Sequence, residues 1–288
     1  MQALPQPVES LPEKQRAALI TLLADDDPAV HQMVRNKILS FGPLAGQWLR
    51  PYLLHADPIL RRRASEIVEH LARAHGHDRF LQFCVRTGEE LDLEQGLGLL
   101  AQTRYPHINL DGYRALYDQW AVTLRELIGL KTDPEQVLGI VSRYFFEGLG
   151  FKGDEQRNLS AGSCFINSVV DRRVGNSVTL CAVYLLIARR LGLPMVGISL
   201  PGYFLCRYQT ATREFYLDIF KKGKFWTKGD CVKFLQSTQQ NLQDGHLSPA
   251  SPRRVLVRSV ATLHQAYSHL EIRDEAARMQ RYLVALAR

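Results

Sequence analysis

The chain has 288 residues, of which 46% are hydrophobic and 23% are charged, and its formal net charge is +7. This length is enough for one large domain or two ordinary domains with a real core. No apolar run approaches the length that crosses a bilayer, and the N-terminal residues lack the basic and then apolar pattern of a signal peptide, so we expect a soluble protein with no membrane partner.

The five cysteines are odd in number and widely spaced: Cys84, Cys164, Cys181, Cys206 and Cys231. None of them forms a Cys-x-x-Cys pair. This pattern indicates neither a disulfide framework nor a zinc ribbon. We therefore expect a reducing, cytoplasmic location and no cofactor.

The basic residues gather in short groups at residues 61–63, 172–173, 189–190, 221–224 and 253–254. A positive surplus is compatible with nucleic acid or an acidic partner. However, these groups are scattered over five predicted elements, as solvated faces and helix C-termini usually are. Nucleic-acid binding is therefore the less favoured interpretation.

Residues 1–103 are predicted to form successive short helices. Apolar residues recur at helical spacing over about 11–23, 30–39, 44–54 and 60–71, and two further helices are expected within 76–103. Asp27-Pro28 and Asp57-Pro58 are thirty residues apart, and each pair suits a helix start. This weak repeat predicts a HEAT-like helical module, which is either a protein-binding surface or a cap over the rest of the chain.

Three histidines, His70, His75 and His77, fall within one short window. Histidines at close spacing can converge on a metal. No cysteine or carboxylate completes a ligand set at suitable spacing, and histidines near a helix C-terminus need no metal. We predict no metal site.

Residues 104–240 mix helix and strand patterns. Helices are expected from Asp111, from Asp133-Pro134 and over about 178–190, followed by strands over 195–200, 203–208 and 215–220 and a short helix capped by Thr227. A polar, glycine-rich loop over 151–162 is long enough to lie over a cleft. Two final helices, 252–270 and 274–287, complete a mostly helical α+β chain with a small antiparallel sheet, an architecture that many domains share.

The central block carries a more specific signal. Phe151 to Asp154, Asn167, Asp171 to Arg173, Gly175, the run Ile187 to Pro194 and Leu200-Pro201-Gly202 resemble the SirB-type branch of the transglutaminase-like superfamily. The resemblance runs from about Arg104 to the C-terminus. It implies a bacterial, cytoplasmic protein with a transglutaminase-like, papain-like core at 104–240 and a tetratricopeptide-like hairpin at 241–288, and that branch has no securely assigned reaction.

The resemblance also implies three positions for a catalytic triad. Active members of the superfamily use a Cys nucleophile, a His base and an Asp; here the matching positions hold Ser177, Tyr203 and Asp218. A serine hydroxyl needs a positioned base. Tyrosine has an ordinary pKa of about 10, against about 6.5 for histidine, so near neutral pH it already holds its proton and cannot accept another.

Cys164 is a rival nucleophile because it precedes a predicted helix beside the expected cleft, although no histidine is near it in the sequence. The sequence therefore favours a non-catalytic interaction or regulatory protein on a degenerate transglutaminase-like scaffold. It would bind an unidentified protein partner or a ligand near Asn167, Ser177, Tyr203 and Asp218. The alternative is a cysteine or serine hydrolase or acyltransferase with relocated catalytic residues.

Overall fold

A computed structural model describes residues 11–86, 91–155, 160–241, 243 and 245–287. The chain forms two compact units: residues 1–78 with 102–107, and residues 79–101 with 108–288. The expected division at 103/104 and 240/241 stays a prediction about domains. Residues 79–101 belong to the larger unit, to which the ion pairs of Asp92 and Glu94 tie them.

The smaller unit is a set of helices around an apolar core. Its elements are α1 (Glu13–Leu22), α2 (Pro28–Leu39), α3 (Pro43–Leu49), the 3₁₀ turn η1 (Arg50–Leu54) and most of α4 (Pro58–Cys84). The side chain of Asp27 accepts the Ala29 amide at 2.8 Å, and Asp57 accepts the Ile59 amide at 2.8 Å. Both Asp-Pro pairs thus start helices as expected, while HEAT character stays a prediction.

Two segments of this unit differ from the sequence-based expectation. The helix that was expected to end near residue 71 continues as α4 to Cys84, through Gly76. A Cβ on Gly76 would lie 2.7 Å from the carbonyl oxygen of Gln102, so the glycine permits a close approach of two backbones within a helix that packing maintains. The helix expected over 44–54 changes to a 3₁₀ turn at Arg50, next to Pro51, whose backbone nitrogen has no hydrogen to continue the α-helical hydrogen bonds.

The larger unit contains the remaining helices. They are α5 (Leu93–Gln102), α6 (Leu110–Ile128), α7 (Pro134–Arg143), the π-turn η2 (Tyr144–Gly148), the 3₁₀ turn η3 (Ala161–Ser163), α8 (Ile166–Arg172), α9 (Ser177–Arg190), α10 (Lys228–Ser237), α11 (Pro252–His269) and α12 (Arg273–Leu286). Asp133 caps α7 and a Thr227–Asp230 capping box starts α10. α6 begins one residue before Asp111, and Asn109 is its cap rather than Asp111.

Five antiparallel strands form the main sheet in the order β6-β5-β4-β3-β7. Their bounds are β3 (Met195–Leu200), β4 (Tyr203–Gln209), β5 (Glu214–Asp218), β6 (Lys224–Trp226) and β7 (Pro249–Ala250). The first three match the predicted strands, and the mostly helical α+β class is confirmed. Two short parallel strands, β1 (Lys152–Gly153) and β2 (Val174–Gly175), lie outside this sheet.

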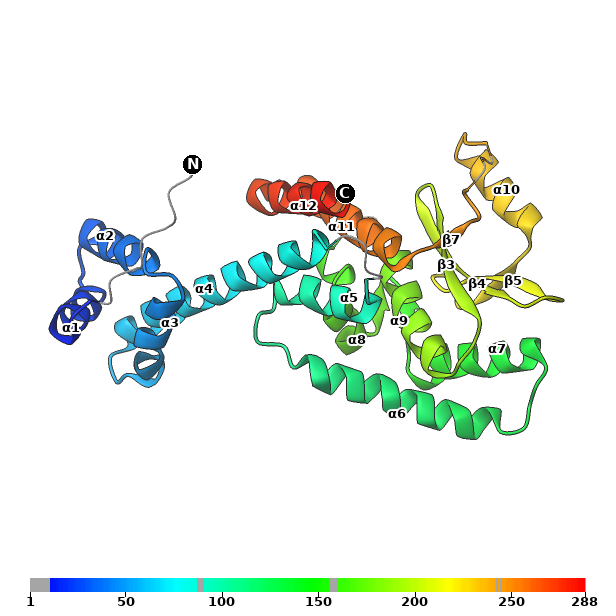
Figure 1. Ribbon diagram of the computed structural model, residues 1–288, viewed down its shortest axis with the longest axis horizontal. Helices are drawn as coiled ribbons and strands as arrows, with labels where there is room; N and C mark the ends of the chain where they lie inside the picture. The colour runs from blue at the N-terminus through cyan, green and yellow to red at the C-terminus, as the bar shows by residue number, and fades with distance from the viewer. Residues whose placement is uncertain (1–10, 87–90, 156–159, 242, 244, 288) are drawn as a thin grey trace. The chain divides into compact units, whose positions relative to one another are not determined.

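The two faces of the main sheet carry different helices. α9 contacts β3 and β4, and α6, α8 and α11 pack around α9 (Figure 1). The side chains of Phe204 and Cys206 face α9, as would a side chain at Gly197. A Cβ on Gly197 would meet the Phe204 ring and Leu185, and Cys206 Sγ lies 3.8 Å from the Cys181 carbonyl oxygen. The opposite face is covered by α10, through Cys231 and Leu235.

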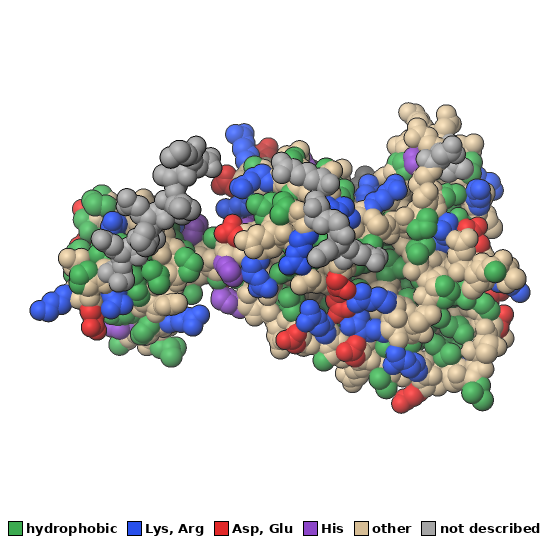
Figure 2. All heavy atoms as spheres, viewed as in Figure 1, with side chains coloured by type: hydrophobic (Ala, Val, Ile, Leu, Met, Phe, Trp, Pro, Cys, Tyr) green, Lys and Arg blue, Asp and Glu red, His purple; other side chains and the backbone are tan. Residues whose placement is uncertain are grey.

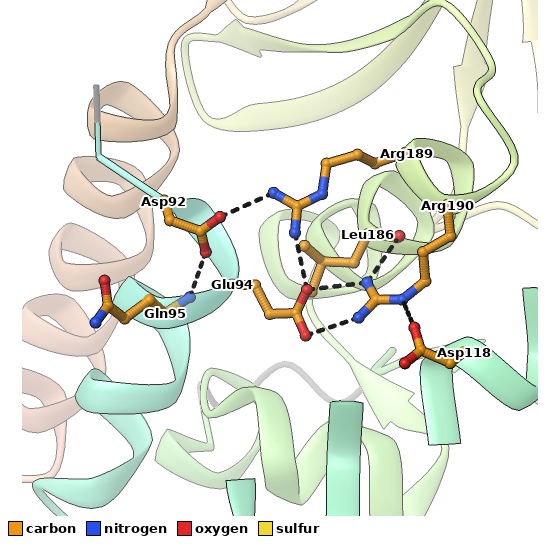
Figure 3. Close-up of polar contacts among 7 residues, drawn as sticks. All are labelled: Asp92, Glu94, Gln95, Asp118, Leu186, Arg189 and Arg190. Carbon is orange, nitrogen blue, oxygen red and sulfur yellow. Dashed lines mark hydrogen bonds and ion pairs between the residues drawn. The ribbon is translucent and has the colours of Figure 1, made fainter. Parts of the chain in front are cut away.

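The C-terminal end of α9 is tied to α5 and α6 by an ion-pair cluster (Figure 3). Arg190 holds Glu94 with two hydrogen bonds of 2.9 Å and also pairs with Asp118, while Arg189 pairs with Glu94 at 2.9 Å and with Asp92 at 3.0 Å. The Glu94 side chain is only 10% exposed and that of Arg190 only 15%. These bonds join segments about 95 residues apart and place α5 in the larger unit.

The final helices, α11 and α12, pack against each other, and α11 contacts α9, so this hairpin lies on the core as expected. Its tetratricopeptide-like character stays a prediction. No helix in the described part of the chain is long and apolar enough to cross a membrane.

Candidate functional site

Two of the three predicted triad positions meet in the structure. Tyr203 begins β4 and Asp218 ends β5, the next strand of the sheet. The Tyr203 hydroxyl donates to the Asp218 carboxylate, 2.9 Å from Oδ1 and 3.0 Å from Oδ2. The backbone N–H of Lys221 donates to the same Oδ1 at 3.0 Å. Asp218 is therefore a hydrogen-bonded carboxylate whose partner is a phenol.

The electrostatics keep the proton on the phenol. Burial raises the pKa of Tyr203, and the neighbouring Asp218 carboxylate raises it further. Asp218 is fully buried, and burial raises its pKa even though the Lys221 amide and the Tyr203 hydroxyl stabilise the charged form. A tyrosine whose pKa is raised cannot accept a proton near neutral pH, so this pair cannot act as a general base through Tyr203.

Aromatic rings pack around Tyr203. Its ring stacks on Trp226 with centroids 6.1 Å apart, lies 5.1 Å from Phe234 of α10, and meets the Phe220 ring edge-on at 6.3 Å. Trp226 and Phe234 also contact each other. The phenol is thus part of an aromatic cluster that packs on the α10 side of the sheet, and packing alone accounts for most of its environment.

Ser177 does not join this pair. Side chains alternate between the two faces along a strand, and Phe204 and Cys206 face α9. Tyr203 lies among the residues packed with α10 on the other face, whereas Ser177 is the first residue of α9. Within the described residues, the Ser177 hydroxyl makes no hydrogen bond.

A second polar group surrounds the start of α9 and centres on Asn176, which sequence reasoning did not single out. Its side-chain oxygen caps α9 by accepting the Thr179 amide at 2.9 Å, and its side-chain nitrogen donates to the Ser163 carbonyl at 3.0 Å and contacts Cys164 Sγ at 3.2 Å. An Asn directly before an apolar helical run is a cap signal. The sequence thus contains the signal for the cap, whereas only the structure reveals that Asn176 contacts Cys164.

Cys164 is enclosed beside this cap. It is 1% exposed, its thiol points towards the Ser160 carbonyl at 3.7 Å, and its own carbonyl accepts the Thr179 hydroxyl at 3.3 Å. Burial raises the pKa of the Cys164 thiol to about 12, although the hydrogen bonds from Asn176 and Ser163 act in the opposite direction. Because the thiolate is the nucleophile, this raised pKa disfavours reaction at Cys164 near neutral pH.

The remaining polar candidates form no catalytic constellation. All five cysteines are buried free thiols. No described histidine hydrogen-bonds to Cys164 or Ser177. Asn167 on α8 is 5% exposed, and its side-chain oxygen has no hydrogen-bond partner within the described residues. Over those same residues, no three His, Cys, Asp or Glu side chains are arranged to hold a metal ion.

A hollow of about 850 Å³ opens beside the Tyr203–Asp218 pair. It is lined by β1, Arg172, Val174 and the turn that follows β5, including Phe220. Phe220 connects the two features because its ring also packs against Tyr203. Through this contact we assign the hollow to the candidate site.

The comparisons with known proteins agree with this fold. A UPF0162 protein of Xylella fastidiosa is 29% identical over 199 residues, covering 66% of this chain and 70% of the relative. A UPF0162 protein of Pseudomonas aeruginosa is 33% identical over 137 residues, covering 46% and 49%. F-box only protein 21 of Mus musculus is 29% identical over 136 residues, covering 44% of this chain and 21% of the relative. No solved structure matches the chain significantly.

The family comparison covers the part of the chain that carries the candidate site. Residues 111–261, which include α6 to α9, the main sheet and the first half of α11, match the model described as transglutaminase-like superfamily. This match extends over more than half of the chain. The chain therefore belongs to the transglutaminase-like superfamily.

Proposed function

We propose that the chain is a non-catalytic binding or regulatory protein of the SirB-type branch, in which a transglutaminase-like scaffold holds a ligand or partner and performs no acyl transfer. The observation that carries the proposal is the bond from the Tyr203 hydroxyl to both oxygens of Asp218. In an active member, an imidazole at this position would accept a proton. Here a phenol stands in its place, and the Asp218 carboxylate accepts the hydrogen bond of that phenol.

The arrangement of the sheet supports the same proposal. Tyr203 and Asp218 lie on the α10 side, and Ser177 begins the helix that packs on the other side. A nucleophile and its base need to lie within hydrogen-bond reach of each other, about 2.6–3.2 Å. Losing a base that serves a hydroxyl nucleophile costs about 10⁶ in rate in the subtilisin comparison. The five free thiols accord with the cytoplasmic location that the proposal includes.

The test is an activity screen on the whole chain. The purified protein would be incubated with p-nitrophenyl acetate, and with a glutamine-containing peptide plus hydroxylamine, which together report esterase and acyl-transfer chemistry. We expect rates equal to those of Ser177→Ala, Cys164→Ala and Asp218→Asn. Turnover that any one of these substitutions abolishes would refute the proposal, provided that circular dichroism shows the variant folded.

A thiol hydrolase is the second candidate, because the Asn176 side chain touches Cys164 Sγ at the start of a helix. That position is where a helix N-terminus stabilises a thiolate. Labelling of the native protein with iodoacetamide near neutral pH separates the candidates. Rapid, stoichiometric modification of Cys164 would favour the hydrolase, whereas labelling only after unfolding supports the binding protein.

A further inference from the structure

The hollow beside the Tyr203–Asp218 pair is rich in positive charge. Four basic side chains line it: Lys152 of β1, Arg172 at the end of α8, and Lys221 and Lys222 of the turn between β5 and β6. Asp154 and Glu155 line it as well, so the lining carries two more positive than negative charges. Three separate segments contribute the cations, and the tertiary structure alone brings them together.

None of the four cations forms an ion pair with a carboxylate within the described residues, although Lys221 interacts electrostatically with the buried Asp218. Arg189 and Arg190 differ from these four cations, because they form ion pairs with Glu94, Asp92 and Asp118. The four cations outnumber the two carboxylates of the lining, so an anion between them would reduce the repulsion that remains. The lining therefore favours an anionic occupant.

Backbone geometry fixes these positions. A Cβ on Gly153 would lie 2.8 Å from the Phe220 carbonyl oxygen, so only glycine lets β1 approach the turn this closely. Lys222 has a φ of 55° and Gly223 a φ of 72°, and the Gly223 amide donates to the Asp218 carbonyl at 2.8 Å. A positive φ is unfavourable for the backbone of a lysine, so the surrounding turn must maintain this conformation. The turn thereby fixes the backbone position from which the Lys222 side chain extends.

Arg172 is positioned in a similar way. The point where a Cβ of Gly162 would lie is 2.8 Å from Arg172 Nη1, so this glycine leaves the space that the guanidinium occupies. An alanine there would displace the side chain. Two glycines thus shape the hollow, because Gly153 leaves space for the Phe220 backbone and Gly162 leaves space for the Arg172 guanidinium.

We propose that this hollow binds a small molecule that carries two or more linked phosphate groups. Its volume lies within the range of small-molecule sites, about 300–1,000 Å³. Lysine binds phosphate as a point charge and arginine as a two-pronged donor, and the lining offers both. The half-buried ring of Phe220 adds an apolar wall. The choice of this hollow rests on the binding function proposed above, and the proposal names the ligand class.

A bounded hollow also distinguishes this ligand from a nucleic-acid strand. A strand is followed by a continuous basic groove. The lining of the hollow includes Asp154 and Glu155 beside its cations, and acidic side chains also lie among the basic ones on the face of the larger unit shown in Figure 2. The geometry accordingly favours a compact oligophosphate over a long polyanion.

The test is isothermal titration of the full chain with inorganic tripolyphosphate and with ATP, at about 50 mM and about 200 mM salt. We expect binding that weakens with salt. Lys221→Gln combined with Lys222→Gln should weaken it at least about tenfold, because each lost charge-assisted contact is among the stronger hydrogen bonds. The matched control, Lys228→Gln combined with Lys233→Gln on α10, removes the same charge outside the hollow and should keep the affinity within about twofold.

Each result decides the proposal. Tighter binding of ATP than of tripolyphosphate, or equal binding of both, supports it and shows whether more than phosphate is recognised. No binding of either probe at the lower salt overturns it, as does an equal loss in the control. A single-stranded oligonucleotide that binds more tightly than ATP also overturns it. Acyl-transfer turnover combined with ATP binding would overturn the proposed function alone, and lack of both would overturn only the ligand.

Discussion

Tyr203→Phe isolates the contribution of one hydroxyl to the buried pair. The substitution removes the donor that lies 2.9 Å and 3.0 Å from the two oxygens of Asp218, and it leaves the ring in its aromatic cluster. Asp218 is fully buried, so water does not replace the lost bond. A hydrogen bond to a charged group contributes about 1.5–3 kcal/mol. We expect the free energy of unfolding of the larger unit to fall by about that amount near pH 7.

The pH dependence of this loss has a definite sign. Burial raises the pKa of Asp218 in the folded protein, so the folded state binds its proton more readily than the unfolded state, and this group makes stability fall as the pH rises through that window. Losing the Tyr203 hydroxyl removes an interaction that lowers this pKa, so the pKa rises further. Once Asp218 is protonated, only a neutral hydrogen bond is missing, about 1 kcal/mol. The difference between wild type and variant should therefore shrink as the pH falls from neutral through the raised pKa of Asp218.

The assay is urea unfolding followed by tryptophan fluorescence, because Trp226 stacks on the Tyr203 ring and reports on this region. Tyr208→Phe on the same strand is the matched control, since its hydroxyl makes no hydrogen bond within the described residues. A change of less than about 0.5 kcal/mol for Tyr203→Phe near pH 7 would contradict the reasoning. So would a loss that stays the same as the pH is lowered through the raised pKa of Asp218.

Three further predictions concern the rest of the larger unit. Glu94→Gln removes the buried charge partner of Arg190, which keeps only the exposed Asp118, and should destabilise by about 3 kcal/mol in the same urea assay. Glu275→Gln, which loses a more exposed pair, should change stability by less than about 1 kcal/mol, and equal effects would show that burial does not set the cost. Thr227→Ala breaks the capping box of α10 and should cost about 1 kcal/mol, with amide hydrogen exchange accelerated in the first turn; unchanged exchange would show that the cap is redundant. All five thiols should react with Ellman's reagent only in denaturant, because burial raises the pKa of Cys164 to about 12, and fast native labelling would reveal an accessible thiolate.

Local signals in the sequence determined the helices, the strands and many of their ends. Asp27, Asp133 and Thr227 cap the helices that follow them because a side-chain oxygen beside a helix start accepts a free amide, whatever the rest of the fold does. The three predicted strands of the central block also follow from a local signal, since short apolar runs bounded by Pro201-Gly202 and by polar turn residues are typical of buried strands. Where local signals failed, as at Gly76, packing kept a helix intact across a residue that usually interrupts one.

Only the tertiary structure decided what the candidate residues do. Alternation along β4 places Tyr203 and Phe204 on opposite faces, but which face α9 covers depends on how the whole sheet packs, and that choice separates Ser177 from Asp218. The partners of Arg190, the enclosure of Cys164 by Asn176 and the gathering of four cations around one hollow all join segments far apart in the sequence. Periodicity describes neighbours along the chain, whereas charge, burial and reactivity depend on neighbours in space.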